Sequence, residues 1–281
     1  MGGGFMLRLL LCIALAIGIF AKSAYAQPEK GHPVSADVLK DLAPTGKLRA
    51  AMNFGNGVLV QRGATDQDPK GVAPDLAREL AKRLNVPITF VGFDGAGQVF
   101  DALKVPSDDP KVWDIAFLAI EPVRAAEIAF TAPYVLIEGT YMVLKDSPLK
   151  TVDDVDRPGH RISVGPKSAY DLFLTRTLKH AELVRADMGG GEAMVQLFLR
   201  DKLDAAAGVR QPLEAYAKTE PKVRVMSDRF MEIRQAMGIP QGRPAGAAYI
   251  KAFVEEMKAS GFVADALARS GQKATVGPAE K

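Results

Sequence analysis

The sequence has almost no cysteine and, beyond its first residues, no long hydrophobic run. Its single cysteine, Cys12, lies in an N-terminal apolar stretch, so the remainder of the chain can form neither a disulfide nor a thiolate metal site. No later apolar run approaches the roughly 20 residues that a transmembrane helix needs. We therefore expect a chain that can reside in an oxidising compartment without forming disulfides, and that has no membrane span.

Catalytic and cofactor motifs are also missing. The chain has no nucleophile elbow, no HExxH zinc motif, no Walker loop and no dinucleotide fingerprint. The three histidines, His32, His160 and His180, lie far apart in polar loops or at a helix end, so we interpret them as surface residues. The sequence predicts no metal site and no cofactor.

The N-terminus has the parts of a secretory signal. Arg8 precedes the apolar run 9–20, and Ala24-Tyr25-Ala26 fits a cleavage site of small residues. Residues 1–26 are interpreted as a signal peptide that is removed, which predicts a periplasmic protein. A lipid anchor is disfavoured because Leu11 precedes Cys12, where a lipoprotein signal has a small residue.

The charges of the remaining chain are nearly balanced. Loss of residues 1–26 removes Arg8 and Lys22 and no acid, so the 36 basic residues fall to 34 against 33 acidic ones. A net charge near zero gives no reason to expect a nucleic acid or a membrane surface as partner. With 48% apolar residues over this length, the chain can bury a core in one large or two smaller domains.

Short strands and helices alternate along the chain. Strands are predicted at 48–52, 88–91 and 115–120, with helices starting at Asp75 and near Val99 between them. Such a series predicts an α/β fold with a parallel sheet. After Tyr134 the pattern restarts, which indicates a second lobe; its predicted strands are 139–145, 161–164, 183–184 and 204–209, with helices after Ser168 and the glycines 189–191.

The chain is expected to cross between the two lobes twice, near Tyr134–Glu138 and Met231–Gln235. Two connections allow the lobes to close on a ligand like a hinge, and the cleft between them is the predicted site. Helices at 247–259 and 263–268 and a polar tail follow. The predicted division is a leader at 27–44, one lobe at 45–135 with 236–281, and the other lobe at 136–235.

One cation, Arg124, lies at a position where open α/β sheets bind ligands. The run Ile115–Ile120 lacks alternation, as expected of a parallel strand covered on both faces, and Pro122 ends it. Arg124 follows just past the carboxyl end of that strand, at the edge where open α/β sheets place ligands. Arg124 either contacts a ligand or is a surface residue paired with Glu127 or Glu121.

Five segments, in order, resemble the type II periplasmic solute-binding proteins of ABC uptake systems, in the polar amino-acid-binding branch, family 3. The segments are GKLRAAMNF, KGVAPDLARELAKRL, DIAFLAIEPVRAAEIAFTAPY, HRISVGPKSAYDLFL and KLDAAAG. The resemblance covers nearly all of the chain after the signal peptide. It implies a two-lobed fold with mixed sheets, in a monomer that closes around a small solute, an amino acid or another carboxylate, and presents it to an inner-membrane ABC permease.

The resemblance also implies site residues. Arg124 matches the arginine that grips the α-carboxylate of a bound amino acid, a role that suits its planar guanidinium. Ser168 matches a small hydroxyl residue at a helix start where backbone N–H groups favour an anion, although it is equally an ordinary N-cap. Lys167 beside it is either solvated or in the cleft. One of Asn53 and Asn56, in a cleft-lining loop, is expected to contact the ligand.

Three departures from the amino-acid pattern bear on the ligand. Ala119 stands where the pattern has a small hydroxyl residue that binds the ligand. The acid that pairs with the α-ammonium group is absent, since Val209 and Arg210 follow the KLDA strand. The aromatic residue expected after the 88–91 strand is also absent, which leaves Phe54 or Phe93 to stack on a ligand.

These departures argue against a standard α-amino acid held in the usual way, because an ammonium group buried without a carboxylate is costly. Glu121 or Glu138 could replace the missing acid. Alternatively, if Arg210 faces the cleft, two arginines and a helix N-terminus would favour an organic acid or a ligand with more than one acidic group. Arg210 could instead be a surface residue at a helix start.

Two other functions compete with solute transport. Relatives with this fold include periplasmic enzymes of the cyclohexadienyl dehydratase type, and Glu121 or Glu138 could supply the general acid that such chemistry needs. A sensor domain would normally be fused to a transmembrane helix, whereas this chain ends in a polar tail. The sequence predicts a non-catalytic binding component of an ABC uptake system, with the dehydratase-like enzyme as the alternative.

Overall fold

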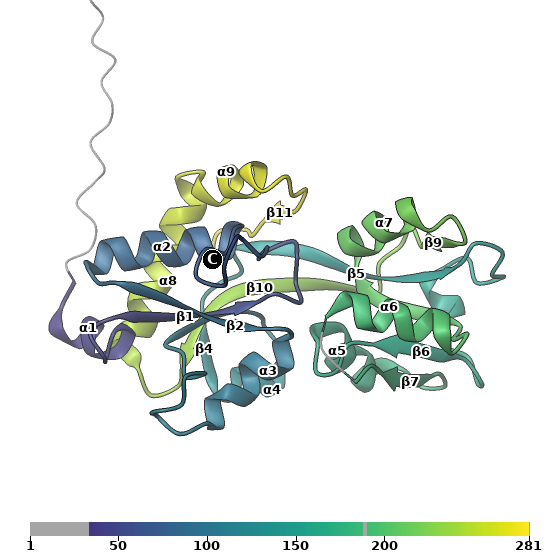
Figure 1. Ribbon diagram of the computed structural model, residues 1–281, viewed down its shortest axis with the longest axis horizontal. Coiled ribbons are helices and arrows are strands. Elements are labelled where there is room, and N and C mark those ends of the chain that lie inside the picture. Colours follow the sequence, from purple (N-terminus) through teal and green to yellow (C-terminus); the bar gives the residue numbers. More distant parts are fainter. Residues whose placement is uncertain (1–33, 188–189, 281) are drawn as a thin grey trace, which may run out of the picture. The chain divides into compact units, whose positions relative to one another are not determined.

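The computed structural model describes residues 34–187 and 190–280, which form a mixed α/β structure (Figure 1). The predicted signal peptide, with Cys12, lies outside the described residues, as do His32 and the leader up to residue 33. Within the described parts of the chain, no helix is long and apolar enough to cross a membrane.

Every strand of the described residues joins one hydrogen-bonded sheet, in the order β2-β1-β3-β10-β5-β8-β6-β7 with three short strands at its sides. Strands β1, β2 and β3 are parallel to one another, as are β6, β7 and β8, whereas β5 and β10 run antiparallel to their neighbours. The strands of the main path are β1 (Leu48–Asn53), β2 (Ile88–Phe93), β3 (Ile115–Ala119), β5 (Val135–Leu144), β6 (Arg161–Val164), β7 (Glu182–Arg185), β8 (Ala205–Val209) and β10 (Met231–Pro240).

The first group of strands confirms the predicted β-α-β-α-β series. Helix α2 (Val72–Leu84) buries Leu76, Leu80 and Leu84 on the face that the sequence predicted. It begins three residues before the predicted Asp75. The reason is Gly71, whose φ of +115° and contact with the Leu59 carbonyl admit no side chain and start the helix. Helix α3 (Ala96–Asp101) and the 3₁₀ turn η1 (Ala102–Lys104) then lead toward β3.

Strand β3 is buried at all five positions, which confirms a strand covered on both faces. The Trp113 indole N–H just before it donates to the Val99 carbonyl at 2.9 Å and fixes the entry of the strand. Beyond β3 the chain forms the short helix α4 (Pro122–Ala125) and strand β4 (Ile128–Phe130), which pairs with β10.

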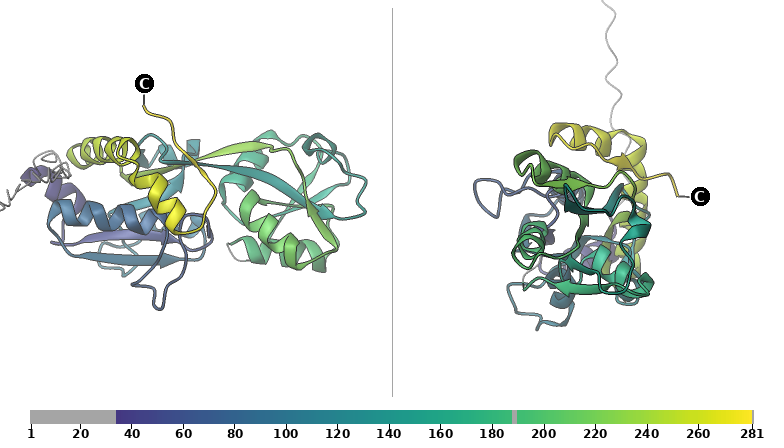
Figure 2. Two further views of the ribbon diagram at one scale, coloured as in Figure 1. Left: turned by 90° about the horizontal axis from the view of Figure 1, so that it is seen from above. Right: turned by 90° about the vertical axis from the view of Figure 1, so that its right-hand side faces the viewer.

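Two long strands, β5 and β10, provide the predicted crossings. They pair antiparallel from Val135 opposite Gln235 to Gly139 opposite Met231. Beyond this segment β5 continues to Leu144 and β10 to Pro240, at opposite ends of it (Figure 1). The C-terminal tail, predicted only as polar, adds strand β11 (Thr275–Val276) to the side of β5 at Val135 and Leu136 (Figure 2). The residue limits of the two lobes stay a prediction.

The second group of strands carries its own helices. The 3₁₀ turn η2 (Val152–Asp154) starts with the capping box of Thr151 and Asp154 and precedes β6. Around β6, β7 and β8 lie helices α5 (Ala169–Thr177), α6 (Gly191–Arg200) and α7 (Arg210–Thr219), while strand β9 (Val223–Val225) pairs with β5. Helices α8 (Pro244–Ala259) and α9 (Phe262–Arg269) follow β10 and confirm the two predicted C-terminal helices.

One helix lies where the sequence predicted a leader. Helix α1 (Ala36–Leu42) starts at Ser35, whose hydroxyl accepts from the Val38 N–H at 3.3 Å, and it buries Leu42 completely. The Asp41 carboxylate accepts from the Gly246 N–H of α8 at 2.9 Å. The folded part of the chain therefore includes residues 34–44 of the predicted leader. Val38, Leu39 and Leu42 follow the helical spacing i, i+1, i+4, a signal that the sequence reasoning did not use.

Candidate ligand-binding site

A cavity of about 430 Å³ is lined by loops and helix starts from both predicted lobes, a volume typical of small-molecule sites. The strands β5 and β10 cross beside it, and Ile233 and Gln235 of β10 form part of its wall. Five of the nine predicted site residues line it, namely Asn53, Asn56, Ala119, Arg124 and Ser168. That these residues contact a ligand stays a prediction.

The side chain of Arg124 is 1% exposed and lies at the cavity from helix α4. Its Nη1 donates to the Ala119 carbonyl at 3.1 Å and its Nη2 to the Lys167 carbonyl at 2.8 Å. Among the described residues, no carboxylate lies within ion-pair distance of this guanidinium. The alternative of a surface arginine paired with Glu127 or Glu121 is therefore wrong.

Burial shifts the pKa of this arginine. It lowers the pKa of Arg124 to about 10, partly opposed by the charge of Glu121, so the side chain is still a cation at neutral pH. A guanidinium has five N–H donors and the two carbonyls occupy two of them, so donors remain for an anion. A buried cation without a carboxylate in ion-pair contact among the described residues is the feature of this cavity that most needs a ligand.

Helix α5 presents its N-terminus to the cavity. Ser168 is its N-cap, as predicted, and its hydroxyl accepts from the Asp171 N–H at 3.1 Å. Ala169 and Tyr170, the first two residues of the helix, line the cavity, and N–H groups at such positions have no partner within the helix. The electrostatics of this end of the cavity thus add to those of Arg124 in favouring an anion.

The two asparagines of the loop after β1 differ in how much of their side chains is free. The Oδ1 of Asn53 already accepts from the Gly55 N–H at 3.1 Å. Asn56 is only 8% exposed, and its buried Oδ1 has no hydrogen-bond partner among the described residues. Of the two, Asn56 is therefore the residue whose side-chain oxygen still lacks a hydrogen-bond donor among the described residues.

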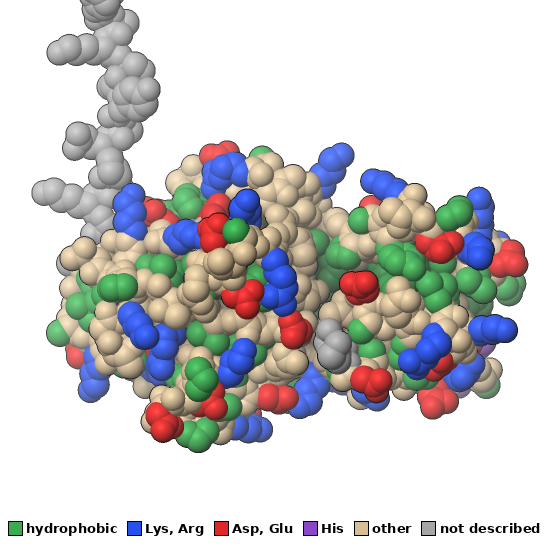
Figure 3. Space-filling model, in the orientation of Figure 1, with side chains coloured by type: hydrophobic (Ala, Val, Ile, Leu, Met, Phe, Trp, Pro, Cys, Tyr) green, Lys and Arg blue, Asp and Glu red, His purple; other side chains and the backbone are tan. Residues whose placement is uncertain are grey.

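The opposite wall of the cavity is apolar. It is formed by α6, the end of β8 and the first turns of α7, through Met194, Val195, Val209, Pro212, Leu213 and Tyr216. Hydrophobic side chains gather over α6 and α7 in Figure 3. The sequence reasoning placed a helix start at Arg210 but missed this wall. The apolar face of the helix could have been found, because Pro212, Leu213 and Tyr216 follow the helical spacing i, i+1, i+4.

Charged groups are few along this lining. Apart from Arg124, the charged side chain among the described lining residues is Glu192, which is exposed in the first turn of α6. The described residues contain no group of three or more His, Cys, Asp or Glu side chains that could hold a metal ion. The site can thus bind by hydrogen bonds, one buried positive charge and apolar contact.

A model of the bacterial extracellular solute-binding proteins, family 3, matches residues 61–271. This chain belongs to that family. The family assignment agrees with the resemblance that its five segments carry.

Solved structures similar to this solute-binding protein share its two-lobed periplasmic-binding-protein fold, which confirms the predicted fold class. A mutant of ArgBP from T. maritima is 19% identical with a TM-score of 0.68, covering 83% of this chain and 99% of its own. An ancestral amino-acid-binding protein, a precursor of cyclohexadienyl dehydratase, is 22% identical with a TM-score of 0.67, covering 84% and 99%. A solute receptor for L-cysteine of Neisseria gonorrhoeae is 18% identical with a TM-score of 0.68, covering 84% and 93%.

Three predicted site residues of this solute-binding protein have side chains engaged away from the cavity lining. The Glu121 carboxylate accepts from Arg176 at 2.7 Å. The Lys167 ammonium group pairs with Asp101 at 2.7 Å, and its backbone carbonyl is the group that Arg124 contacts. The Arg62 guanidinium lies over the Phe54 ring, with Cζ 4.1 Å from the ring centroid. Phe54 does not line the cavity, so its position gives no support to the expectation that it stacks on a ligand.

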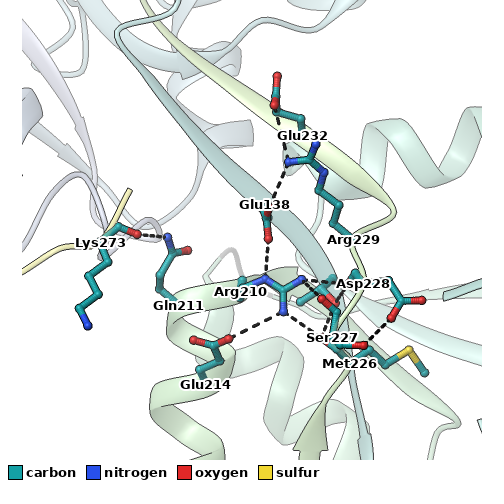
Figure 4. Close-up of polar contacts among 11 residues, drawn as sticks. Glu138, Arg210, Gln211, Glu214, Met226, Ser227, Asp228, Arg229, Glu232 and Lys273 are labelled. Carbon is teal, nitrogen blue, oxygen red and sulfur yellow. Dashed lines mark hydrogen bonds and ion pairs between the residues drawn. The ribbon is translucent and has the colours of Figure 1, made fainter. Parts of the chain in front are cut away.

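Arg210, the fourth, does not line the cavity, so its position gives no support to the hypothesis of two arginines facing a ligand. Its Nε donates to the Glu138 carboxylate at 2.6 Å, and its Nη groups donate to the carbonyls of Met226, Ser227 and Asp228 at 2.8–2.9 Å (Figure 4). Glu214, one turn further along α7, lies 3.7 Å away. The carboxylate of Glu138 offsets the unfavourable position of a cation at a helix start.

The ion pair of Glu138 and Arg210 predicts an acid-sensitive contribution to stability. The hydrogen bond from Arg210 holds the pKa of the Glu138 carboxyl below its ordinary value of 4.5. A depressed folded-state pKa gives stability that is present above about pH 4.5 and is lost as the pH falls through the folded-state value. We expect Glu138→Gln to flatten the fall of the melting temperature below pH 5. A matched change at the exposed Glu192 should leave that slope as it is, and equal slopes for all three proteins would contradict the assignment.

Proposed function

We propose that this protein is the periplasmic binding component of an ABC uptake system and that it holds a small carboxylate-bearing solute through Arg124. The observation that carries the proposal is the buried guanidinium at the cavity, which has only two carbonyl partners and no carboxylate among the described residues. A ligand carboxylate would supply the missing negative charge, and the N-terminus of α5 would stabilise it further.

The wider role follows from the family. Its members are extracellular solute-binding proteins, and structures of similar fold include an amino acid ABC transporter protein bound to L-arginine. We infer that the protein is exported by its N-terminal signal, acts as a monomer and passes its solute to an inner-membrane permease. The almost balanced charge gives no support to a nucleic-acid partner.

The dehydratase alternative has weaker support. The two acids that could act as its general acid, Glu121 and Glu138, are each held by an arginine and do not line the cavity. A general acid must reach the substrate within hydrogen-bond distance, and neither carboxylate is placed to do so. We therefore propose binding without chemical turnover.

The test is a thermal-shift panel of amino acids and of carboxylic acids without an amino group, measured on the signal-free protein. A ligand present at about a hundred times its dissociation constant should add roughly 2.7 kcal/mol to the free energy of unfolding. The strongest ligand is then incubated with the protein and examined by NMR for a product. Stabilisation by carboxylates with no product is the expected result. Stabilisation only by compounds without a carboxylate, or conversion of the ligand, would contradict the proposal.

A further inference from the structure

We propose that the solute of this cavity is a monocarboxylic acid with an uncharged, largely apolar body and a hydroxyl group, and that it is not an α-amino acid. The inference rests on the proposed function and specifies its ligand class. It uses three features of the lining: its charge balance, its apolar wall and the unpartnered Oδ1 of Asn56.

The charge balance admits one negative group. Arg124 is the buried cation of the lining, and one carboxylate neutralises it. A second acidic group would have no cation, because Arg210 and Lys167 are paired with Glu138 and Asp101 away from the lining. Burial in this cavity therefore favours a ligand with a single negative charge, since every further buried charge needs a partner of its own.

An ammonium group would lack a buried partner. Glu192 is the acid along the described lining, and it is exposed in the first turn of α6, where the positive end of the helix already stabilises its charge. The two nearest candidates from the sequence, Glu121 and Glu138, are bound to Arg176 and to Arg210. An α-ammonium group would thus lose its hydration without gaining a buried carboxylate.

The apolar wall selects the body of the ligand. Val209 ends β8 at the cavity, and Leu213 and Tyr216 continue the same surface along the first turns of α7. Contact with this wall favours an aliphatic or aromatic group, because the apolar surface of both is removed from water. A basic or acidic side chain would instead leave its charge against apolar atoms.

Asn56 specifies the remaining polar group. Asn56 lines the cavity, and its buried Oδ1 has no hydrogen-bond partner among the described residues, which is a costly state for a buried acceptor. A ligand hydroxyl supplies the missing donor without bringing a charge.

The experiment compares ligands that differ at one substituent. Calorimetry on the signal-free protein would use L-phenylalanine, L-3-phenyllactate and 3-phenylpropionate, and the aliphatic series L-leucine, L-2-hydroxy-4-methylpentanoate and 4-methylpentanoate. Within each series the carbon beside the carboxylate carries an ammonium, a hydroxyl or a hydrogen. We expect the hydroxy acid to bind at least about tenfold more tightly than the amino acid in at least one series, with the unsubstituted acid between them.

The outcomes separate this inference from the proposed function. Amino acids that bind as tightly as the hydroxy acids, or more tightly, overturn the inference and leave the proposed function in place. Binding of dicarboxylates more tightly than of all six compounds does the same. Absence of binding by every carboxylate, in these series and in the wider panel, overturns both.

Two variants report on the residues used. Val209→Asp places a carboxylate on the apolar wall, and we expect the preference for hydroxy acid over amino acid to fall by at least about tenfold. Asn56→Ala should bring the hydroxy and unsubstituted acids to within about twofold of each other. Glu192→Gln is the control: if it weakens only the amino acids, Glu192 is their ammonium partner and the inference fails. The ratio measured on the unchanged protein decides the matter should the Val209 variant not fold.

Discussion

The Arg124→Met variant is expected to lose carboxylate binding by at least about a hundredfold while staying folded. Each charge-assisted hydrogen bond from the guanidinium to a ligand carboxylate is worth about 1.5–3 kcal/mol, and two such bonds correspond to a loss of a hundredfold to ten-thousandfold in affinity. The measurement is the dissociation constant of the best carboxylate by calorimetry, together with the melting temperature of the ligand-free variant.

The free protein should tolerate this change because methionine fills similar space without a charge. Arg124 is 1% exposed and has no carboxylate partner among the described residues, so its removal ends the cost of burying a cation. Against this, the carbonyls of Ala119 and Lys167 each lose a donor. The opposing effects lead us to expect a change of unfolding free energy within about 2 kcal/mol.

Arg124→Lys is the matched control for geometry. A lysine keeps the positive charge but has no planar fork, so its affinity should lie between those of the unchanged protein and the methionine variant. Undiminished binding by the methionine variant would show that the ligand is held elsewhere in the cavity.

The Arg210→Leu variant is expected to show the reverse behaviour, with a loss of stability of about 2–4 kcal/mol. Arg210 joins Glu138 on β5, the carbonyls that follow β9 and the start of α7, and its side chain is 17% exposed. Its removal takes four hydrogen bonds from this region. The Glu138 carboxylate keeps Arg229 as a donor, and the carbonyls of Met226 and Asp228 keep the Thr140 hydroxyl. Urea unfolding would measure the change in the free energy of unfolding.

The exposed Arg200 offers a matched control for this prediction. It also pairs with an acid, Asp201, but its side chain is 68% exposed, so Arg200→Leu should leave the free energy of unfolding almost unchanged. The preference among ligands should survive in the Arg210 variant, because this side chain does not line the cavity. A shift in that preference would restore the hypothesis that Arg210 contacts the solute.

The two arginines illustrate how far sequence reasoning reaches. Arg124 lies past the end of β3, a strand recognisable from its own apolar run, and its position at the cavity follows from local chain order. Arg210 also follows a strand, β8, and by the same argument could have faced a ligand. Its direction was decided by Glu138, 72 positions earlier, and by carbonyls 16–18 positions later.

The sequence by itself determined the order of strands and helices, the two crossings and the location of Arg124, because hydrophobic period, glycine and proline positions and helix caps act over a few residues. Tertiary structure alone decided which polar groups are already paired. Glu121 and Lys167 were candidate ligand-binding residues because of their positions in the sequence. In the structure Glu121 pairs with Arg176 and Lys167 pairs with Asp101, both distant in the chain. Asn56 keeps an unpartnered oxygen at the cavity. Hydrogen bonds and ion pairs of this kind join residues far apart in the chain, so no local pattern records them, and they leave a single cation facing an apolar wall.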